Sequence, residues 1–539
     1  MFHNFLRRDS RDTLKWTVSK CVSGVMVVEH SGGRARTYGR RWGTLTAAVA
    51  AVVALGISGC TPVTDSSESA LQVERFPSVY AQTIEWGACG DDFGLDDEKF
   101  ERLTDRGAPV ETYECAMIEA PLDWNATSNH KTIELAAVRI PATGSGEPIG
   151  SLLGNPGGPG GSGLDLAYGL PTVQGFESVL EQYDLVGFDP RGIGRSTPAQ
   201  CADVSDIFEL NLATCADEHP IALSMGTSQV ARDMDLLRAL LGDDTLHYLG
   251  YSYGTMLGAT YSTLFPERVG RMILDSASAS DWASPIGSFN QSAAITREVT
   301  AMIDDCGTEY EVATCPIEGV DGLGSMIVEI NETPLVASDG TEVYGQTIYG
   351  YLTTALYKPQ VGRELVLDHI GRAVTGDQEA IDDIAEAMQS GGAAVSLDGT
   401  IVRCHSFPED PNLMGLVEHI EEAGLPELMG GPEINDDTLR PFVDLTCDAL
   451  PNSGDDITDT FTGSPDAPIL VIGITGDHAT PYEGAQQMVR ELGNARLLTL
   501  EGHGHGASFA NRSTCADDFA TDYLLTGELP PKDAVCTDD

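Results

Sequence analysis

Gly250-Tyr-Ser-Tyr-Gly254 lies between two segments of different periodicity. The apolar run Leu246–Gly250 before it favours a buried strand, and Met256–Phe265 after it has the apolar spacing of a helix. A strand and a helix joined by so short a turn approach each other closely, so small residues are needed on both sides of the turn. The pentapeptide therefore predicts a strand–turn–helix unit from which the Ser252 hydroxyl projects.

Strand-like and helix-like segments alternate along much of the chain. Strands are expected at Cys115–Leu122, Thr132–Ile140, Ile149–Leu153, Tyr183–Asp189, Leu246–Gly250, Arg271–Asp275, Ala467–Ile474 and Arg496–Glu501, and helices at Thr227–Leu241, Met256–Phe265, Tyr482–Leu492 and Ala516–Thr526. This rhythm predicts an α/β fold with a mostly parallel sheet. Residues 286–460 are instead largely helical in pattern. We therefore expect a helical cap there, inserted before the last strands, between core segments 86–285 and 461–539.

The first 59 residues differ in composition from the rest. They hold nine of the 31 basic residues of the chain but only three of its 82 acidic residues. The small apolar run Leu45–Ile57 follows, and it is shorter than the ~20 residues that a bilayer span requires. A basic region, a short apolar stretch and small residues before a cleavage point are typical of a secretory signal, which we assign to residues 1–59.

Ile57-Ser-Gly-Cys60 resembles a bacterial lipobox, in which the cysteine is lipidated and becomes the mature N-terminus. Cys60 is therefore the candidate lipidation site, and ordinary secretion with Cys60 as a chance thiol is the alternative. Residues 60–85 are polar and poorly patterned, so they are expected to form a tether. The expected location is extracytoplasmic, with membrane contact only through the lipid.

Charge and cysteine content narrow the possible partners and the compartment. Without residues 1–59 the chain has a net charge of −57, which repels nucleic acid and anionic membranes. Ten cysteines remain besides Cys21 and Cys60, and an even number in an exported chain predicts disulfides. Pairing in chain order would close five local loops, although other pairings are open. No cysteines or histidines have zinc-site spacing, so no metal is expected.

A nucleophilic serine needs a base, and the base needs an acid to orient it. Where a serine occupies this kind of turn, the acid and then the histidine follow it in the chain. Asp477, after the strand ending at Ile474, and His505, in Glu501–Gly506, are the late candidates. Both lie in loops after predicted strands, at the edge of the sheet where sites of α/β proteins are built.

Other residues compete for these roles. Asp275 follows the strand after Ser252 and is a second candidate acid, although it could equally cap the segment that begins at Ser276. His503 is the main rival of His505, since both are flanked by glycines. His478 adjoins Asp477 and is more readily interpreted as a loop residue.

The segment Asn155-Pro-Gly-Gly-Pro-Gly-Gly-Ser-Gly163 contains a Gly-x-Gly-x-x-Gly spacing. Its two prolines suit a phosphate-binding helix start poorly, so no dinucleotide or other cofactor is expected. A better interpretation is an oxyanion loop, because glycine lets the backbone N–H approach a substrate carbonyl. Gly158 N–H and Tyr253 N–H, the latter from the residue after the nucleophile, would form the pair.

Several motifs together resemble the actinobacterial tripeptidyl aminopeptidases, relatives of proline iminopeptidase that include lipoprotein proteases of the carboxylesterase A type. They are Asn155–Gly163, Asp189–Ser196, Gly250–Thr255, Asp477-x-x-Thr480-Pro481 and Gly502-x-Gly-His505-Gly506. The resemblance covers roughly residues 85–539. It implies an α/β-hydrolase fold in which Ser252 is the nucleophile, Asp477 the acid and His505 the base. It also implies an oxyanion site at Gly157–Gly158 with Tyr253, and a structural turn at 189–196.

The resemblance further implies an aminopeptidase that releases short peptides, such as tripeptides, from free N-termini through an acyl-enzyme. A carboxylesterase or lipase is the alternative, because the same residues cleave esters, and a catalytically inactive binding lipoprotein is a third. The sequence departs from the family's pattern at positions that bear on substrate choice. Asn155-Pro156 stands where proline iminopeptidases have His-Gly, and the segments around Cys404 and Cys447 lack the aromatic and acidic residues expected in a cap.

Overall fold

A computed structural model describes residues 67–539 except 127–129, 203, 206, 309, 311, 313–314, 318, 391–395, 408–412, 444 and 452–459. The predicted signal segment 1–59 and the candidate lipidation site Cys60 lie outside the described residues. No helix within the described ranges is long and apolar enough to cross a membrane.

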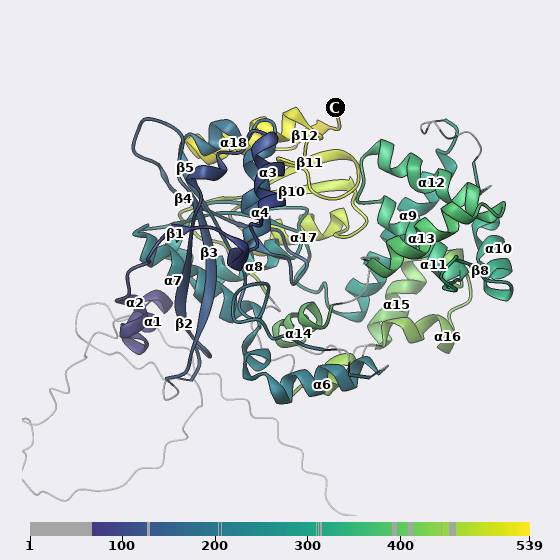
Figure 1. Ribbon diagram of the computed structural model, residues 1–539, viewed down its shortest axis with the longest axis horizontal. Coiled ribbons are helices and arrows are strands. Elements are labelled where there is room, and N and C mark those ends of the chain that lie inside the picture. Colours follow the sequence, from purple (N-terminus) through teal and green to yellow (C-terminus); the bar gives the residue numbers. More distant parts are fainter. Residues whose placement is uncertain are drawn as a thin grey trace, which may run out of the picture. The chain divides into compact units, whose positions relative to one another are not determined.

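Ten strands form one sheet in the order β1-β2-β3-β5-β4-β6-β7-β10-β11-β12 (Figure 1). Their bounds are β1 Gly87–Ala88, β2 Glu114–Pro121, β3 Thr132–Ile140, β4 Gly150–Asn155, β5 Tyr183–Phe188, β6 Leu246–Tyr251, β7 Val269–Asp275, β10 Ile469–Gly476, β11 Ala495–His503 and β12 Ala534–Thr537. The pairs from β1 to β5 are antiparallel, and all pairs from β5 to β12 are parallel. The prediction of a mostly parallel sheet is confirmed.

Helices cover both faces of the sheet. One face packs against α7 (Thr227–Leu241), α8 (Tyr253–Leu264) and α17 (Tyr482–Leu492), and the other against α3 (Asp97–Asp105), α4 (Gly163–Gly169), α5 (Glu177–Leu180) and α18 (Thr514–Thr526). The sequence of strand β10 is apolar because both of its faces are buried. Ile469 and Val471 belong to the first hydrophobic cluster and Leu470 and Ile472 to the second, because successive strand residues point to opposite faces.

Most of the predicted cap has a hydrophobic core of its own (green in Figure 1). Its helices are α9 Pro285–Asp304, α10 Gly319–Glu332, α11 Gly345–Ala355, α12 Gln360–Val374, α13 Gln378–Ser390, α15 Leu413–Ala423 and α16 Asp436–Leu439, with a hairpin of β8 Leu335–Val336 and β9 Glu342–Val343. Helix α14 (Leu397–Ser406) differs, because its Ile401 and Val402 pack into the core cluster beside α7. The segment 286–460 is therefore not a single unit.

The N-terminal part of the described chain corrects one expectation. Residues within the predicted tether 60–85 form α1 (Glu68–Arg75) and α2 (Pro77–Tyr80), so the tether prediction is wrong for them. Phe76 packs edge-on against Trp124 with ring centroids 5.1 Å apart. The composition of helix α1 suggested a tether because the helix is rich in polar residues, which it exposes on one side. Its Gln72 is nevertheless buried.

The remaining helices are short or peripheral. They are α6 Phe208–Glu218 and the 3-10 helices η1 Asp91–Phe93, η2 Val110–Thr112, η3 Leu170–Thr172, η4 Pro220–Ser224, η5 Pro266–Arg268, η6 Glu427–Met429, η7 Arg440–Phe442 and η8 Thr446–Ala449. Among the described residues, five disulfides join the cysteines in chain order: Cys89–Cys115, Cys201–Cys215, Cys306–Cys315, Cys404–Cys447 and Cys515–Cys536. The pairing in chain order, one of those left open, is the one that occurs.

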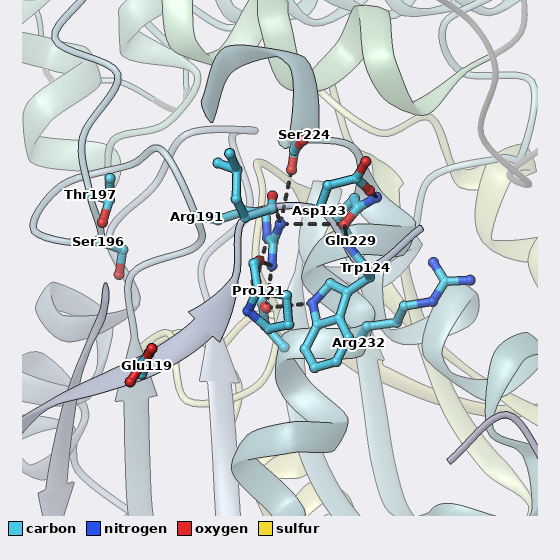
Figure 2. Close-up of polar contacts among 12 residues, drawn as sticks. Glu119, Pro121, Asp123, Trp124, Arg191, Ser196, Thr197, Ser224, Gln229 and Arg232 are labelled. Carbon is cyan, nitrogen blue, oxygen red and sulfur yellow. Dashed lines mark hydrogen bonds and ion pairs between the residues drawn. The ribbon is translucent and has the colours of Figure 1, made fainter. Parts of the chain in front are cut away.

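The turn after β5 is held by a buried ion pair of Arg191, which Figure 2 labels beside Pro121, Trp124 and Gln229. The Arg191 guanidinium is fully buried and donates to both carboxylate oxygens of Asp233, at 2.6 and 2.7 Å. It also donates to the carbonyls of Pro121 and Leu122 at the end of β2. Trp124 Nε1 donates to the same carboxylate at 2.9 Å. The predicted structural turn at 189–196 therefore joins β2, β5 and α7 behind the site.

Candidate active site

The backbone at Ser252 has the strained geometry that the pentapeptide predicts. Its φ is 56° and its ψ is −126°, a region that non-glycine residues rarely occupy, and it joins β6 to α8. A Cβ at Gly250 would lie 2.6 Å from the Gly254 carbonyl oxygen, so only glycine fits there. Ser252 N–H donates to the Asp275 carbonyl at 3.0 Å, which fixes the turn to the end of β7.

The glycine loop after β4 lies against this turn. Gly157 has a φ of +89°, and a Cβ on it would lie 2.4 Å from the Tyr251 carbonyl oxygen and 2.9 Å from Tyr253 N. Gly157 N–H donates to Asn155 Oδ1 at 2.9 Å. Gly158 N–H has no acceptor in the part of the chain that the structure describes. The loop thus brings a backbone donor to the start of α8, where the helix dipole favours negative charge.

Asp477 and His505 meet in the structure. His505 Nδ1 lies 3.0 Å from each carboxylate oxygen of Asp477. A carboxylate only accepts hydrogen bonds, so Nδ1 carries the proton and Nε2 is the basic nitrogen. Asp477 also accepts from Ala479 N–H and from the N–H and hydroxyl of Thr480, each at 2.9 Å. These contacts fix the acid in the loop between β10 and α17.

The electrostatics of this pair suit proton transfer. Burial raises the pKa of Asp477, but the charge and hydrogen bond of His505 and the Thr480 N–H outweigh it, so the net pKa is lowered. Burial lowers the pKa of His505, but the Asp477 carboxylate outweighs it, so the net pKa is raised above its ordinary value. The carboxylate is therefore favoured over its protonated form, and an imidazolium at His505 would be stabilised by it.

Ser252 and His505 are anchored at the same strand end. Ser252 N–H bonds the Asp275 backbone, and Gly506 N–H donates to Ser276 Oγ at 2.8 Å. Within residues 67–539 as described, no hydrogen bond joins Ser252 Oγ to His505 Nε2. Such bonds are often long without substrate and tighten when it binds.

The structure places the competing residues in other positions. The Asp275 carboxylate accepts hydrogen bonds from the backbone of Ala507 and Ser508, not from His505. His503 lies on β11, and its Nδ1 is 2.6 Å from Glu298 Oε2 of α9. His478 is buried, and burial lowers its pKa to about 4, so it stays neutral.

Two residues near the site gave no signal in the sequence. The Tyr357 ring, 63% exposed, lies edge-on to His505 with centroids 5.9 Å apart and to His478 at 4.3 Å. The Glu298 side chain is 5% exposed and lines a small hollow with Gly504. Both belong to the cap, whose sequence carries no motif, and only the fold brings them to the catalytic loops.

A larger cavity of about 520 Å³ lies between the cap and the core. Its cap wall comes from α9 and the end of α15, and its core wall from residues 278–282 and 480–487. Thr480, whose hydroxyl bonds Asp477, is part of that wall. The volume is within the range of pockets that bind small molecules.

Comparisons with known proteins agree with this geometry. A sequence profile described as TAP-like protein matches residues 434–536, and one described as alpha/beta hydrolase fold matches residues 150–295. Serine protease Hip1 of Mycobacterium tuberculosis is 30% identical over 474 residues, covering 78% of this chain and 87% of that protein. The tripeptidyl aminopeptidase of Streptomyces lividans is 27% identical over 512 residues, covering 84% and 86%.

A third relative is carboxylesterase B of Mycobacterium tuberculosis, which is 31% identical over 471 residues, covering 79% of this chain and 87% of that protein. The fold, the strained serine turn and these likenesses lead to the same assignment. The chain belongs to the α/β-hydrolase-fold family that includes the tripeptidyl aminopeptidases, Hip1 and carboxylesterase B, and it is a serine hydrolase.

Proposed function

We propose that the chain is an aminopeptidase that releases short peptides, such as tripeptides, from free N-termini. Ser252 is the nucleophile, His505 the general base and Asp477 the acid that orients it. The main support for this chemistry is the contact of His505 Nδ1 with both carboxylate oxygens of Asp477, each at 3.0 Å. The loop of His505 and the Ser252 turn are both attached to the end of the same strand. The relative named tripeptidyl aminopeptidase supports the substrate class.

The reaction follows from these positions. Ser252 Oγ attacks the scissile carbonyl while its proton passes to His505 Nε2. The oxyanion of the tetrahedral intermediate accepts hydrogen bonds from Gly158 N–H and Tyr253 N–H, at the positive end of α8. The imidazolium then protonates the leaving amine, the C–N bond breaks, and an acyl-enzyme remains. Water, activated by the same histidine, hydrolyses that ester and restores Ser252.

Selection of a free N-terminus requires a negative group near the cleft. Glu298 meets this requirement, because it is nearly buried, comes from cap helix α9 and lies beside the loop that carries His505. Asp305 lines the same hollow, together with Arg363 and with His503, which contacts Glu298 Oε2. A carboxylate in a partly buried position attracts an ammonium group more strongly than one in open solvent. We propose that this hollow receives the substrate ammonium.

The test compares matched substrates and matched variants. A free tripeptide anilide should be cleaved at least tenfold faster than its N-acetylated form, with the tripeptide as the product seen by mass spectrometry. His505→Gln should lose about 10³-fold or more in kcat, whereas His503→Gln should keep kcat within about tenfold. Equal rates on free and acetylated substrates would exclude the aminopeptidase assignment but leave the nucleophile and base intact.

A carboxylesterase is the second candidate, and the likeness to carboxylesterase B favours it. The same nucleophile and oxyanion site cleave esters, so the residues do not separate the two activities. Comparing kcat/KM on acyl esters of rising chain length with kcat/KM on tripeptide anilides distinguishes them. A rise with acyl length, without anilide cleavage, would replace the peptidase proposal.

We also propose that the chain is exported and anchored by a lipid on Cys60. The support is the lipobox-like Ile57–Cys60 after a basic region and a short apolar run. Metabolic labelling with a fatty acid should mark the wild type and the Cys21→Ala control, and Cys60→Ala should abolish the label. A labelled Cys60→Ala protein would refute the anchor.

A further inference from the structure

We propose that Asp275 is a positioning residue that aligns the Ser252 turn with the His505 loop and adds a second negative charge beside the His505 imidazolium. The inference rests on the proposed roles of Ser252 and His505. It assigns to Asp275 a part in the reaction that is distinct from that of the acid, Asp477.

The contacts of Asp275 join the parts of the site. Its backbone carbonyl accepts from Ser252 N–H at 3.0 Å. Its Oδ1 accepts from Ala507 N–H at 3.0 Å, and its Oδ2 accepts from Ser508 N–H at 2.6 Å and Ser508 Oγ at 2.5 Å. One residue therefore holds the nucleophile through its main chain and the segment after His505 through its side chain.

The position of Asp275 in the sheet explains how it reaches both. It is the last residue of β7, where it pairs with Tyr251 of β6 on one side and with Ile472 of β10 on the other. Strand β6 leads into the nucleophile turn, and β10 leads into the loop of Asp477. The Asp275 side chain is fully buried. It thus lies between the nucleophile strand and the acid strand, below the loop of the base.

The loop after His505 is clamped at four successive backbone N–H groups. Gly506 N–H donates to Ser276 Oγ, the next two donate to Asp275, and Phe509 N–H donates to Asp517 Oδ1. A loop held by four side-chain acceptors has little freedom to move the imidazole. Because a misplacement of ~1 Å can cost about 10²-fold in rate, loss of the two central contacts should lower kcat.

Asp275 also acts through its charge. The charged and titratable groups facing it are His505, Asp517 and the Tyr251 hydroxyl. Those facing His505 are Asp477, Asp275, Arg512, His478 and, from the cap, the Tyr357 phenol. Asp275 raises the pKa of His505 in addition to the larger effect of Asp477. Burial raises the pKa of Asp275 above its ordinary value, and the three donors on its two oxygens together with the charge of His505 oppose this rise.

The experiment uses the rate at which an alkyl fluorophosphonate labels Ser252 in the whole protein. In this reaction Ser252 Oγ forms a bond to phosphorus, fluoride leaves with the bonding electrons, and His505 takes the proton. The rate therefore reports the nucleophile and base without depending on peptide or ester preference. It is measured from pH 5 to 9 for the wild type, Asp275→Asn and Ser508→Ala, with thermal unfolding of each.

Asp275→Asn keeps the shape of the side chain but removes its charge and one acceptor. We expect it to label about 10–100-fold more slowly at its plateau, with the acidic limb shifted to lower pH because the imidazolium loses a stabilising charge. Ser508→Ala removes one hydrogen bond and keeps the charge, so its acidic limb should match the wild type. Steady-state kinetics of Asp275→Asn should show the loss in kcat, with KM within about threefold.

Two results would overturn the proposal. One is an Asp275→Asn protein that labels within twofold of the wild-type rate at every pH. The other is an Asp275→Asn protein whose labelling rate falls only in proportion to its unfolded fraction and whose pH–rate profile keeps the acidic limb of the wild type. That result would make Asp275 a purely structural residue. If the wild type itself is not labelled, the proposed function fails instead, so the two failures are distinguishable.

Discussion

Asp477→Asn changes the site at one atom, and its effect can be worked out from the contacts of the carboxylate. Oδ1 accepts from the N–H groups of Ala479 and Thr480, which can only donate, so the amide oxygen of the introduced asparagine takes that position. The amide NH₂ then occupies the Oδ2 position and donates to His505 Nδ1. The proton of His505 moves to Nε2, and Nε2 can no longer accept the proton of Ser252.

The wrong tautomer should lower kcat by about 10⁴-fold, equivalent to about 5 kcal/mol of transition-state stabilisation. KM should change by less than about threefold, since Asp477 is fully buried and contacts no substrate. Steady-state kinetics on a tripeptide anilide and on a p-nitrophenyl ester measure both constants, and unfolding by urea checks that the variant is folded. A loss of less than tenfold would refute the reasoning, because it would mean that another acid orients His505.

Three further predictions follow from the structure. Arg191→Met should lower the free energy of unfolding in urea by about 3–5 kcal/mol, because it leaves the buried Asp233 carboxylate with Trp124 as its main donor. The double change Arg191→Met/Asp233→Leu should lower it by less than the single change. Cys404→Ala/Cys447→Ala opens a 43-residue separation and should cost about 4 kcal/mol by the chain-entropy relation, read from the urea midpoint. The acidic limb of kcat/KM should have its midpoint above pH 6.5, because His505 must be neutral to act and Asp477 raises its pKa; a midpoint below that value would contradict the contact.

Local pattern was sufficient to predict several elements and to name the candidate chemical residues. Strand β3 and helices α7 and α17 begin and end where the periodicity predicts, and Ser252 lies in the predicted turn. The steric demand at Gly250 is local, because a Cβ there would meet the Tyr248 ring and the Gly254 carbonyl oxygen. Such constraints act between neighbours in the chain, and they are therefore visible in the sequence.

The choice between rival residues needed contacts between distant segments. His503 and His505 have the same glycine neighbours, and only the packing shows that the first reaches Glu298 and the second Asp477. From the sequence, Asp275 was a second candidate acid or a cap, and the sheet order places it under the loop of the base. Tyr357 reaches His505 from the cap, more than one hundred residues away along the chain.

The sequence by itself therefore determined the α/β class, the serine turn, the glycine loop beside it and the identity of the late acid and base candidates. These depend on periodicity and on steric limits within a few residues. The tertiary structure alone decided the cap surroundings, the disulfide pairing, the helices within residues 68–80 and the contacts of Asp275 with both the Ser252 turn and the loop after His505. Each of these depends on which distant segments share a face or an edge, and that is set by the packing of the whole chain.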